Sequence, residues 1–288
     1  MSVQGDLVET PPAGVTARRL ETSAGPVAVW DRPGAGPTLL MIHGNSASKG
    51  VFAGMFEAPA LSGRHLVAMD LPGCGEAANA ADPQSAYTIP GMARTAAETI
   101  AALGLANPVV LGWSLGGHVA IEAAGQGVGM AGMILTGTPP CGPGPDEVAE
   151  SFHESEEMEV TFMEDPSADQ LSAYVRHVYG PRRPIPEAFF AAARRSDGRL
   201  RSRFAEHWLA AQEGFHQRTV VAEWANPIAV IQGELEPFFD PSRLDDLSWK
   251  NLWRGAGQMV AGGGHAPFFD QPQAYSELVA QFLDDLGA

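Results

Sequence analysis

Short apolar runs recur along most of the chain, and within each run nearly every position is apolar. Such continuous runs are typical of strands buried on both faces of a parallel sheet. The runs lie at 38–42, 65–69, 108–111, 130–135, 227–231 and 258–261. Ahead of them, residues 15–21 and 27–31 flank a Ser-Ala-Gly-Pro turn and predict a β-hairpin.

Helical patterns fill the spaces between these runs. Residues 90–103 follow Thr88, a suitable helix cap, and stop at Gly104, while residues 115–124 directly follow the third run. Near the C-terminus, apolar residues recur at the spacing of one helix face: Tyr275, Leu278, Val279, Phe282, Leu283 and Leu286. The alternation of strands and helices predicts an α/β fold with a mostly parallel central sheet flanked by helices.

The alternation stops between about residues 144 and 221, where the pattern predicts helices only. Residues 146–169 hold ten acids and no Lys or Arg, and five arginines cluster at 194–203; we interpret both as solvated surface. We therefore expect a core formed by 1–143 and 222–288 with a helical cap inserted at 144–221. A pocket between cap and sheet is the favoured place for a ligand.

A serine stands in the sequence Gly112-Trp-Ser-Leu-Gly116, which has the form G-x-S-x-G. A strand is predicted before it and a helix after it, so Ser114 is expected on a tight turn with its hydroxyl clear of the sheet edge. The flanking glycines let the backbone turn without a Cβ clash, and the helix N-terminus adds positive partial charge nearby. The alternative is a glycine-rich turn with a buried serine. We predict that Ser114 is a nucleophile.

A serine nucleophile needs a base, and His265 fits that role best among the eight histidines. It follows the last predicted strand in a glycine-rich loop that can bring the imidazole to Ser114. His118, one helical turn after Ser114, is interpreted as a packed residue.

The base in turn needs an orienting carboxylate. Glu236 follows the fifth predicted strand, three residues beyond Gly233 and directly before a proline. Glu234 and Asp240 are the alternatives, and we predict Glu236.

Two backbone amides are predicted to bind a developing oxyanion. They belong to Asn45, in the loop that closes the first core strand, and to Leu115, directly after the nucleophile. The side chain of Asn45 is expected to add a further donor. A simple Asx turn at Asn45 is the alternative interpretation.

Composition narrows the class of partner. The 288 residues include 18 Lys+Arg and 34 Asp+Glu, which gives a net charge of −16 and argues against nucleic acid and anionic membranes. A small neutral substrate is expected.

Two cysteines allow no disulfide framework, and neither a metal-ligand motif nor a dinucleotide fingerprint occurs, so we expect no metal and no cofactor. A polar start and the absence of a long apolar run predict a soluble cytoplasmic protein.

These motifs together resemble the α/β-hydrolase superfamily over nearly the whole chain. The matching loops are His43-Gly44, Asp70-Leu-Pro-Gly73, Gly112-Trp-Ser-Leu-Gly-Gly117 and Gly264-His-Ala-Pro267. The order serine, acid, histidine is also that of the superfamily. The family pattern usually has His where this chain has Cys74, a structural position.

A narrower resemblance is to the metal-independent N-acyl-homoserine lactonases of this fold, which degrade bacterial quorum-sensing signals. It rests on His43-Gly-Asn-Ser46, Gly112–His118, Thr136-Gly-Thr-Pro-Pro140, Glu236-Pro-Phe238, Asn251-Leu-Trp253 and Gly264-His-Ala-Pro-Phe268. The resemblance implies a glutamate acid at Glu236 and a substrate-contacting cap tyrosine at Tyr174. We expect further substrate contacts at Trp113, Phe162 and Phe238.

The sequence thus predicts a serine hydrolase that opens the lactone ring through an acyl-enzyme. The alternatives are a general carboxylesterase on small esters, an acylase that cuts the amide, and a non-catalytic binding protein on a hydrolase scaffold. Acyl length and oligomeric state stay open.

Overall fold

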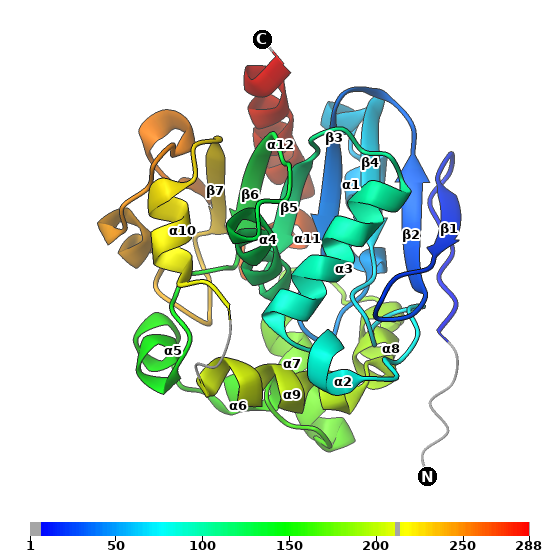
Figure 1. The fold of residues 1–288 in the computed structure, drawn as a ribbon, viewed down its shortest axis with the longest axis vertical. Helices are drawn as coiled ribbons and strands as arrows, with labels where there is room; N and C mark the ends of the chain where they lie inside the picture. The colour runs from blue at the N-terminus through cyan, green and yellow to red at the C-terminus, as the bar shows by residue number, and fades with distance from the viewer. Residues whose placement is uncertain (1–6, 211–213, 288) are drawn as a thin grey trace.

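A single sheet forms the centre of the molecule (Figure 1). The computed structural model describes residues 7–210 and 214–287; the remaining residues of the predicted core and cap, 1–6, 211–213 and 288, lie outside the described part. Within it the strands run in the order β1-β2-β4-β3-β5-β6-β7-β8. Their bounds are Thr16–Leu20, Val27–Arg32, Ala35–Ile42, Arg64–Met69, Val109–Trp113, Gly132–Thr136, Ile228–Gly233 and Gln258–Val260 for β1 to β8.

Strand pairing agrees with the predicted hairpin and parallel sheet. β2 pairs antiparallel with β1 and with β4, and all other neighbours are parallel. Every residue of β5, β6 and β7 is buried, as expected for strands covered on both faces. The same expectation is wrong for β8. It lies at one edge of the sheet, pairs with β7 alone, and leaves Met259 49% exposed.

Helices cover both faces of the sheet. Figure 1 shows α3 (Ile89–Ala102), α4 (Leu115–Gly125) and α10 (Gln217–Glu223) in front of it and α12 (Pro272–Gly287) behind. The predicted cap of α3 is present, because the Thr88 hydroxyl accepts a hydrogen bond from the Gly91 amide at 3.0 Å. Three short helices complete this part: α1 (Ala53–Glu57), α2 (Pro83–Ala86) and α11 (Pro267–Asp270).

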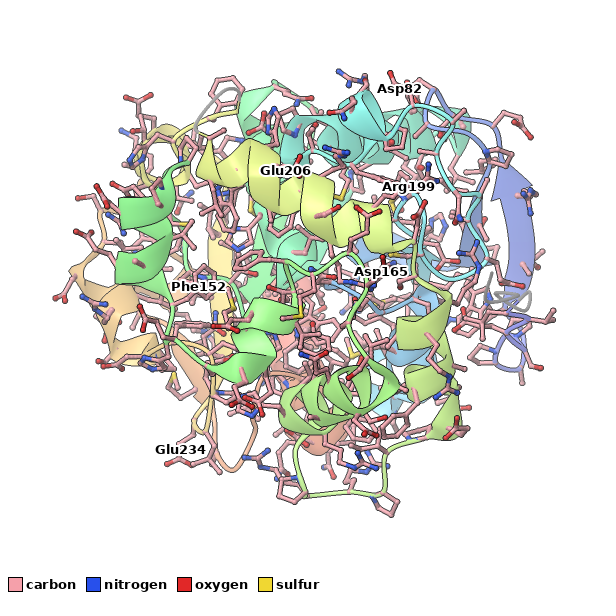
Figure 2. The ribbon with its side chains drawn as sticks, turned by 90° about the horizontal axis from the view of Figure 1, so that it is seen from below. Asp82, Phe152, Asp165, Arg199, Glu206 and Glu234 are labelled. Carbon is pink, nitrogen blue, oxygen red and sulfur yellow. The ribbon has the colours of Figure 1, made fainter. Side chains whose placement is uncertain are left out.

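The helices of residues 145–209 lie below the sheet, at the carboxyl ends of its parallel strands (Figure 1). They are α5 (Pro145–Ser151), α6 (Glu156–Val160), α7 (Ala168–Tyr179), α8 (Glu187–Arg195) and α9 (Gly198–Leu209). Figure 2 views them from outside, with Arg199 and Glu206 on α9. Buried hydrogen bonds join these helices to the rest: Asp197 accepts from the Tyr87 hydroxyl at 2.7 Å and donates its amide to the Gly73 carbonyl at 2.8 Å. None of the described helices has the length and apolarity needed to cross a membrane.

Candidate active site

Ser114 lies on a strained turn between β5 and α4. Its φ of 54° and ψ of −122° fall in a region that non-glycine residues rarely adopt. A Cβ at Gly112 would collide with the Gly116 carbonyl, and one at Gly116 would collide with the Ile42 carbonyl, so the turn requires glycine on both sides. The Ser114 amide donates to the Thr136 carbonyl at 2.8 Å, which holds the turn against β6. The serine therefore stands at the N-terminus of α4, as the motif predicts.

His265 and Glu236 contact each other directly. His265 Nδ1 lies 2.9 and 2.8 Å from the two carboxylate oxygens of Glu236, and both side chains are buried. Glu236 Oε1 also accepts from the Phe238 amide at 2.9 Å. The Trp113 indole donates to the His265 carbonyl at 2.8 Å and so ties the histidine loop to the residue that precedes Ser114. Ser114 and His265 line the same cavity.

The two alternative acids lie elsewhere. Asp240 is exposed, and its carboxylate accepts from the amide and hydroxyl of Ser242. Glu234 is exposed too, and it accepts from the Gly262 amide at 2.9 Å. Within the described residues, neither carboxylate has a hydrogen bond to His265.

Asn45 and Leu115 border the cavity beside Ser114. Their backbone amides have no acceptor among the described residues, so both donors are available to a ligand oxygen. The Asn45 side chain has hydrogen-bond partners within the protein. Its Nδ2 donates to the Thr161 carbonyl at 3.0 Å, and its Oδ1 accepts from the Ser46 hydroxyl at 2.9 Å.

The cavity is lined by residues at the carboxyl ends of the strands and by residues of the segment 152–208, and it has a volume of about 40 Å³. Three of the four predicted substrate contacts, Tyr174, Phe162 and Phe238, line it. The Tyr174 hydroxyl also donates to the Asn45 carbonyl at 3.2 Å. The other lining residues are Asn45, Ser114, Leu115, His118, Phe152, Met158, Thr161, Phe204, Trp208 and His265. Figure 2 labels Phe152, at the end of α5.

Trp113, the fourth predicted contact, does not line this cavity. Its indole packs against Tyr179 and Phe268, with ring centroids 5.8 and 5.1 Å away. Because it is 1% exposed and donates to the His265 carbonyl, its place is behind the histidine loop and not on the cavity wall.

The predicted solvated basic cluster is wrong for Arg201, which is buried (3% exposed). Its guanidinium donates to the Ser46 hydroxyl at 3.0 Å and to the Met163 carbonyl at 2.8 Å, and its burial lowers its pKa. The sequence does carry a signal for this burial. Arg201, Phe204 and Trp208 recur at i, i+3 and i+7, which places the arginine on the apolar face of α9.

One group of acidic side chains in the described part of the chain lies close enough to hold a metal ion: Glu9, Asp70 and Glu76. All three carboxylates bind the Lys49 ammonium, with distances of 2.9 Å for both Glu9 and Asp70. Although burial acts to lower the pKa of Lys49, the carboxylates raise it, so the lysine stays charged. The Lys49 ammonium therefore occupies the position that a metal ion would take among these three carboxylates.

Residues 37–272 match the family model described as alpha/beta hydrolase fold. The chain belongs to this family. Its fold is also that of crystal structures of the N-acyl homoserine lactonase AidH, with a TM-score of 0.90 and 36% identity over 94% of this chain. One of these structures is of an AidH serine variant complexed with N-hexanoyl homoserine lactone, and the match with this chain covers 98% of that protein. Another is of an AidH glutamate variant complexed with N-hexanoyl homoserine, and the match covers 97% of that protein.

The curated relatives of this α/β-hydrolase are named as esterases and not as lactonases. The pimeloyl-[acyl-carrier protein] methyl ester esterase of Aeromonas hydrophila is 26% identical over 274 residues, which span 88% of this chain and 98% of the relative. The enzyme of the same name from Xanthomonas oryzae is 28% identical over 265 residues, 87% of this chain and 96% of its own.

Proposed function

We propose that this α/β-hydrolase is an ester hydrolase that opens the lactone ring of N-acyl-homoserine lactones through a serine, histidine and glutamate triad. The observation that carries the proposal is that Ser114 and His265 line one cavity, while Glu236 binds Nδ1 of the histidine. This arrangement leaves Nε2 of His265 free to accept the serine proton.

The reaction proceeds in two stages. Ser114 Oγ attacks the ring carbonyl carbon while His265 Nε2 takes its proton, and Glu236 stabilises the imidazolium that forms. The amides of Asn45 and Leu115 donate to the oxyanion. The intermediate collapses as the ring C–O bond breaks, and His265 returns the proton to the leaving alkoxide. Water then attacks the acyl-enzyme with His265 as base, which releases the open hydroxy acid and restores the serine.

The cap supplies the binding site for the acyl chain. We assign residues 144–221 to the cap. Within them α6, α7 and α9 contribute side chains to the cavity wall, whereas α10 packs against α4. The cavity wall on this side is mainly apolar, with Phe152, Phe162 and Trp208. Burial of an acyl chain there contributes about 0.8 kcal/mol per CH₂.

The choice of lactone over other esters is supported by the similarity to AidH. The AidH structures hold both the lactone and the corresponding open acid, N-hexanoyl homoserine, which are substrate and product of the proposed reaction. The physiological proposal that goes with it is degradation of a quorum-sensing signal in the cytoplasm, by an enzyme whose partner is a small neutral molecule.

A second candidate is hydrolysis of acyl methyl esters, because the curated relatives are methyl ester esterases that match most of this chain. The same triad would act, with methanol as leaving group. Values of kcat/KM for N-hexanoyl-homoserine lactone and for methyl hexanoate separate the two. The proposal expects the lactone to be preferred by about 100-fold or more, well within the roughly 10⁴-fold discrimination that a site reaches when it hydrogen-bonds a polar group of its substrate. Equal values, or a preference for the methyl ester, would overturn it.

A further inference from the structure

His118 is a polar residue in the cavity wall that the proposed mechanism does not use. It lies on α4 one turn after Ser114, is 3% exposed, and lines the same cavity. Its ring packs against Trp208 and Phe152, with centroids 4.8 and 6.0 Å away. Burial lowers the pKa of His118 to about 4, so the imidazole is neutral at pH 7.

The hydrogen bonds around His118 decide which ring nitrogen carries the proton. His118 Nδ1 lies 2.8 Å from Gln217 Oε1. The same oxygen accepts from the Cys141 backbone amide at 3.4 Å, which identifies it as the carbonyl oxygen of the glutamine. Because an amide oxygen can only accept, Nδ1 is the donor and Nε2 has a free lone pair.

Nε2 has no hydrogen-bond partner among residues 7–210 and 214–287. The described side-chain atoms that are both unpartnered and fully enclosed belong to other residues: Trp30, Thr99, His177 and Asp270. His118 Nε2 is therefore not fully enclosed by protein. Because the His118 ring lines the cavity, we infer that Nε2 faces it. An acceptor among aromatic side chains costs free energy unless a ligand brings a donor to it.

We propose that His118 Nε2 accepts a hydrogen bond from the acyl-amide side of the substrate and so selects lactones that carry a donor there. The inference rests on the proposed function. An N-acyl-homoserine lactone has its amide N–H on the carbon next to the ring carbonyl that Ser114 attacks. His118 lines the same cavity as Ser114, so a substrate whose ring carbonyl lies at Ser114 brings its amide into the cavity that the His118 ring borders. A 3-hydroxyl on the acyl chain offers the same donor chemistry.

The test compares two lactones that differ in the donor only. They are N-hexanoyl-homoserine lactone and its methylene analogue, 2-(2-oxoheptyl)-γ-butyrolactone, in which CH₂ replaces N–H. His118→Phe keeps an aromatic ring against Trp208 and removes the acceptor. It is expected to lower kcat/KM for the amide lactone about 10-fold, the loss typical of one hydrogen bond, and to leave the methylene analogue within about twofold. The matched control Phe152→Leu changes the apolar wall next to His118 and is expected to shift both lactones by the same factor.

The outcomes separate the inference from the function on which it rests. A His118→Phe enzyme whose kcat/KM falls by one common factor on the methylene analogue and on the amide lactones with and without a 3-hydroxyl overturns the inference and leaves lactone opening intact. A wild-type enzyme that opens neither lactone overturns both. N-(3-hydroxyhexanoyl)-homoserine lactone identifies the donor: a loss confined to this substrate assigns the hydroxyl, and a loss on both amide lactones assigns the N–H.

A binding measurement covers the case in which His118→Phe does not fold. Ring-¹⁵N spectra of Ser114→Ala are expected to show His118 with its proton on Nδ1 at pH 7. The Nε2 resonance is expected to move upfield when N-hexanoyl-homoserine lactone is added and to stay when the methylene analogue is added. A proton on Nε2 in the free protein, or an equal shift with both lactones, contradicts the inference.

Discussion

Replacement of Glu236 by Gln removes one negative charge beside His265 and changes the size of the side chain little. In the folded chain Oε1 accepts from the Phe238 amide at 2.9 Å, while both oxygens lie within 2.9 Å of His265 Nδ1. The glutamine oxygen keeps the bond to Phe238, so its NH₂ group takes the place of Oε2. That group donates to Nδ1 and moves the imidazole proton to Nε2, where it blocks proton transfer from Ser114.

The expected size of the effect follows from the geometry. Unit charges 2.8 Å apart interact by about 6 kcal/mol at an effective dielectric of 20. This is the stabilisation that the imidazolium loses in the transition state. At 1.36 kcal/mol per tenfold it corresponds to a loss of about 10⁴ in kcat, the same scale as amidation of the acid in a serine protease triad.

The assay is kcat for lactone opening by purified Glu236→Gln, with circular dichroism to verify the fold. Asp240→Asn is the matched control, since Asp240 is exposed and its carboxylate caps the turn at Ser242. Asparagine serves as well in that cap, so turnover is expected to stay within about twofold. Near-normal turnover of Glu236→Gln, or a larger loss in Asp240→Asn, would refute the assignment of the acid.

The remaining predictions concern the nucleophile, metal and acid stability. Ser114→Ala is expected to lower kcat about 10⁴-fold or more with the fold intact, and normal turnover would exclude an acyl-enzyme at this serine. Exhaustive chelation is expected to leave lactone opening unchanged; loss of activity that zinc restores would contradict a metal-independent reaction. Burial lowers the pKa of both His43 and His118 from 6.5 to about 4, so between these values the unfolded chain binds more protons and the folded chain loses stability as pH falls. Each histidine contributes at most about 1.4 kcal/mol per pH unit, and urea unfolding from pH 7 to 4.5 is expected to show a shallower dependence in His118→Phe than in wild type; identical slopes would contradict this.

The fold was predictable because its signals are local. Continuous apolar runs located the core strands, and the Thr88 cap located the start of α3. The exception is β8, whose edge position depends on strand order, and no local pattern encodes strand order.

Some site residues can likewise be placed from local sequence signals, and others depend on contacts between distant parts of the chain. Ser114 follows from a motif whose glycines are required by backbone contacts, and Glu236 follows from its place after a strand. The Asn45 side chain and Trp113 could not be placed from sequence, because their partners, Thr161 and His265, are far along the chain. The bond from Asn45 to Thr161 depends on how residues 144–221 pack on the sheet, and the bond from Trp113 to His265 depends on how two loops distant in the sequence meet.

The identity of the bond that breaks tests the central proposal most directly. Ser114 could attack either of two carbonyls in an acyl-homoserine lactone, the ring ester and the chain amide. The ester alkoxide leaves more easily than an amine, which needs protonation at nitrogen, and ring opening keeps both halves in one molecule. Mass spectrometry of the reaction with N-hexanoyl-homoserine lactone is expected to give a single product of substrate mass plus one water, which closes to the lactone again on acidification. Free homoserine lactone together with hexanoic acid would identify an acylase and contradict the proposal.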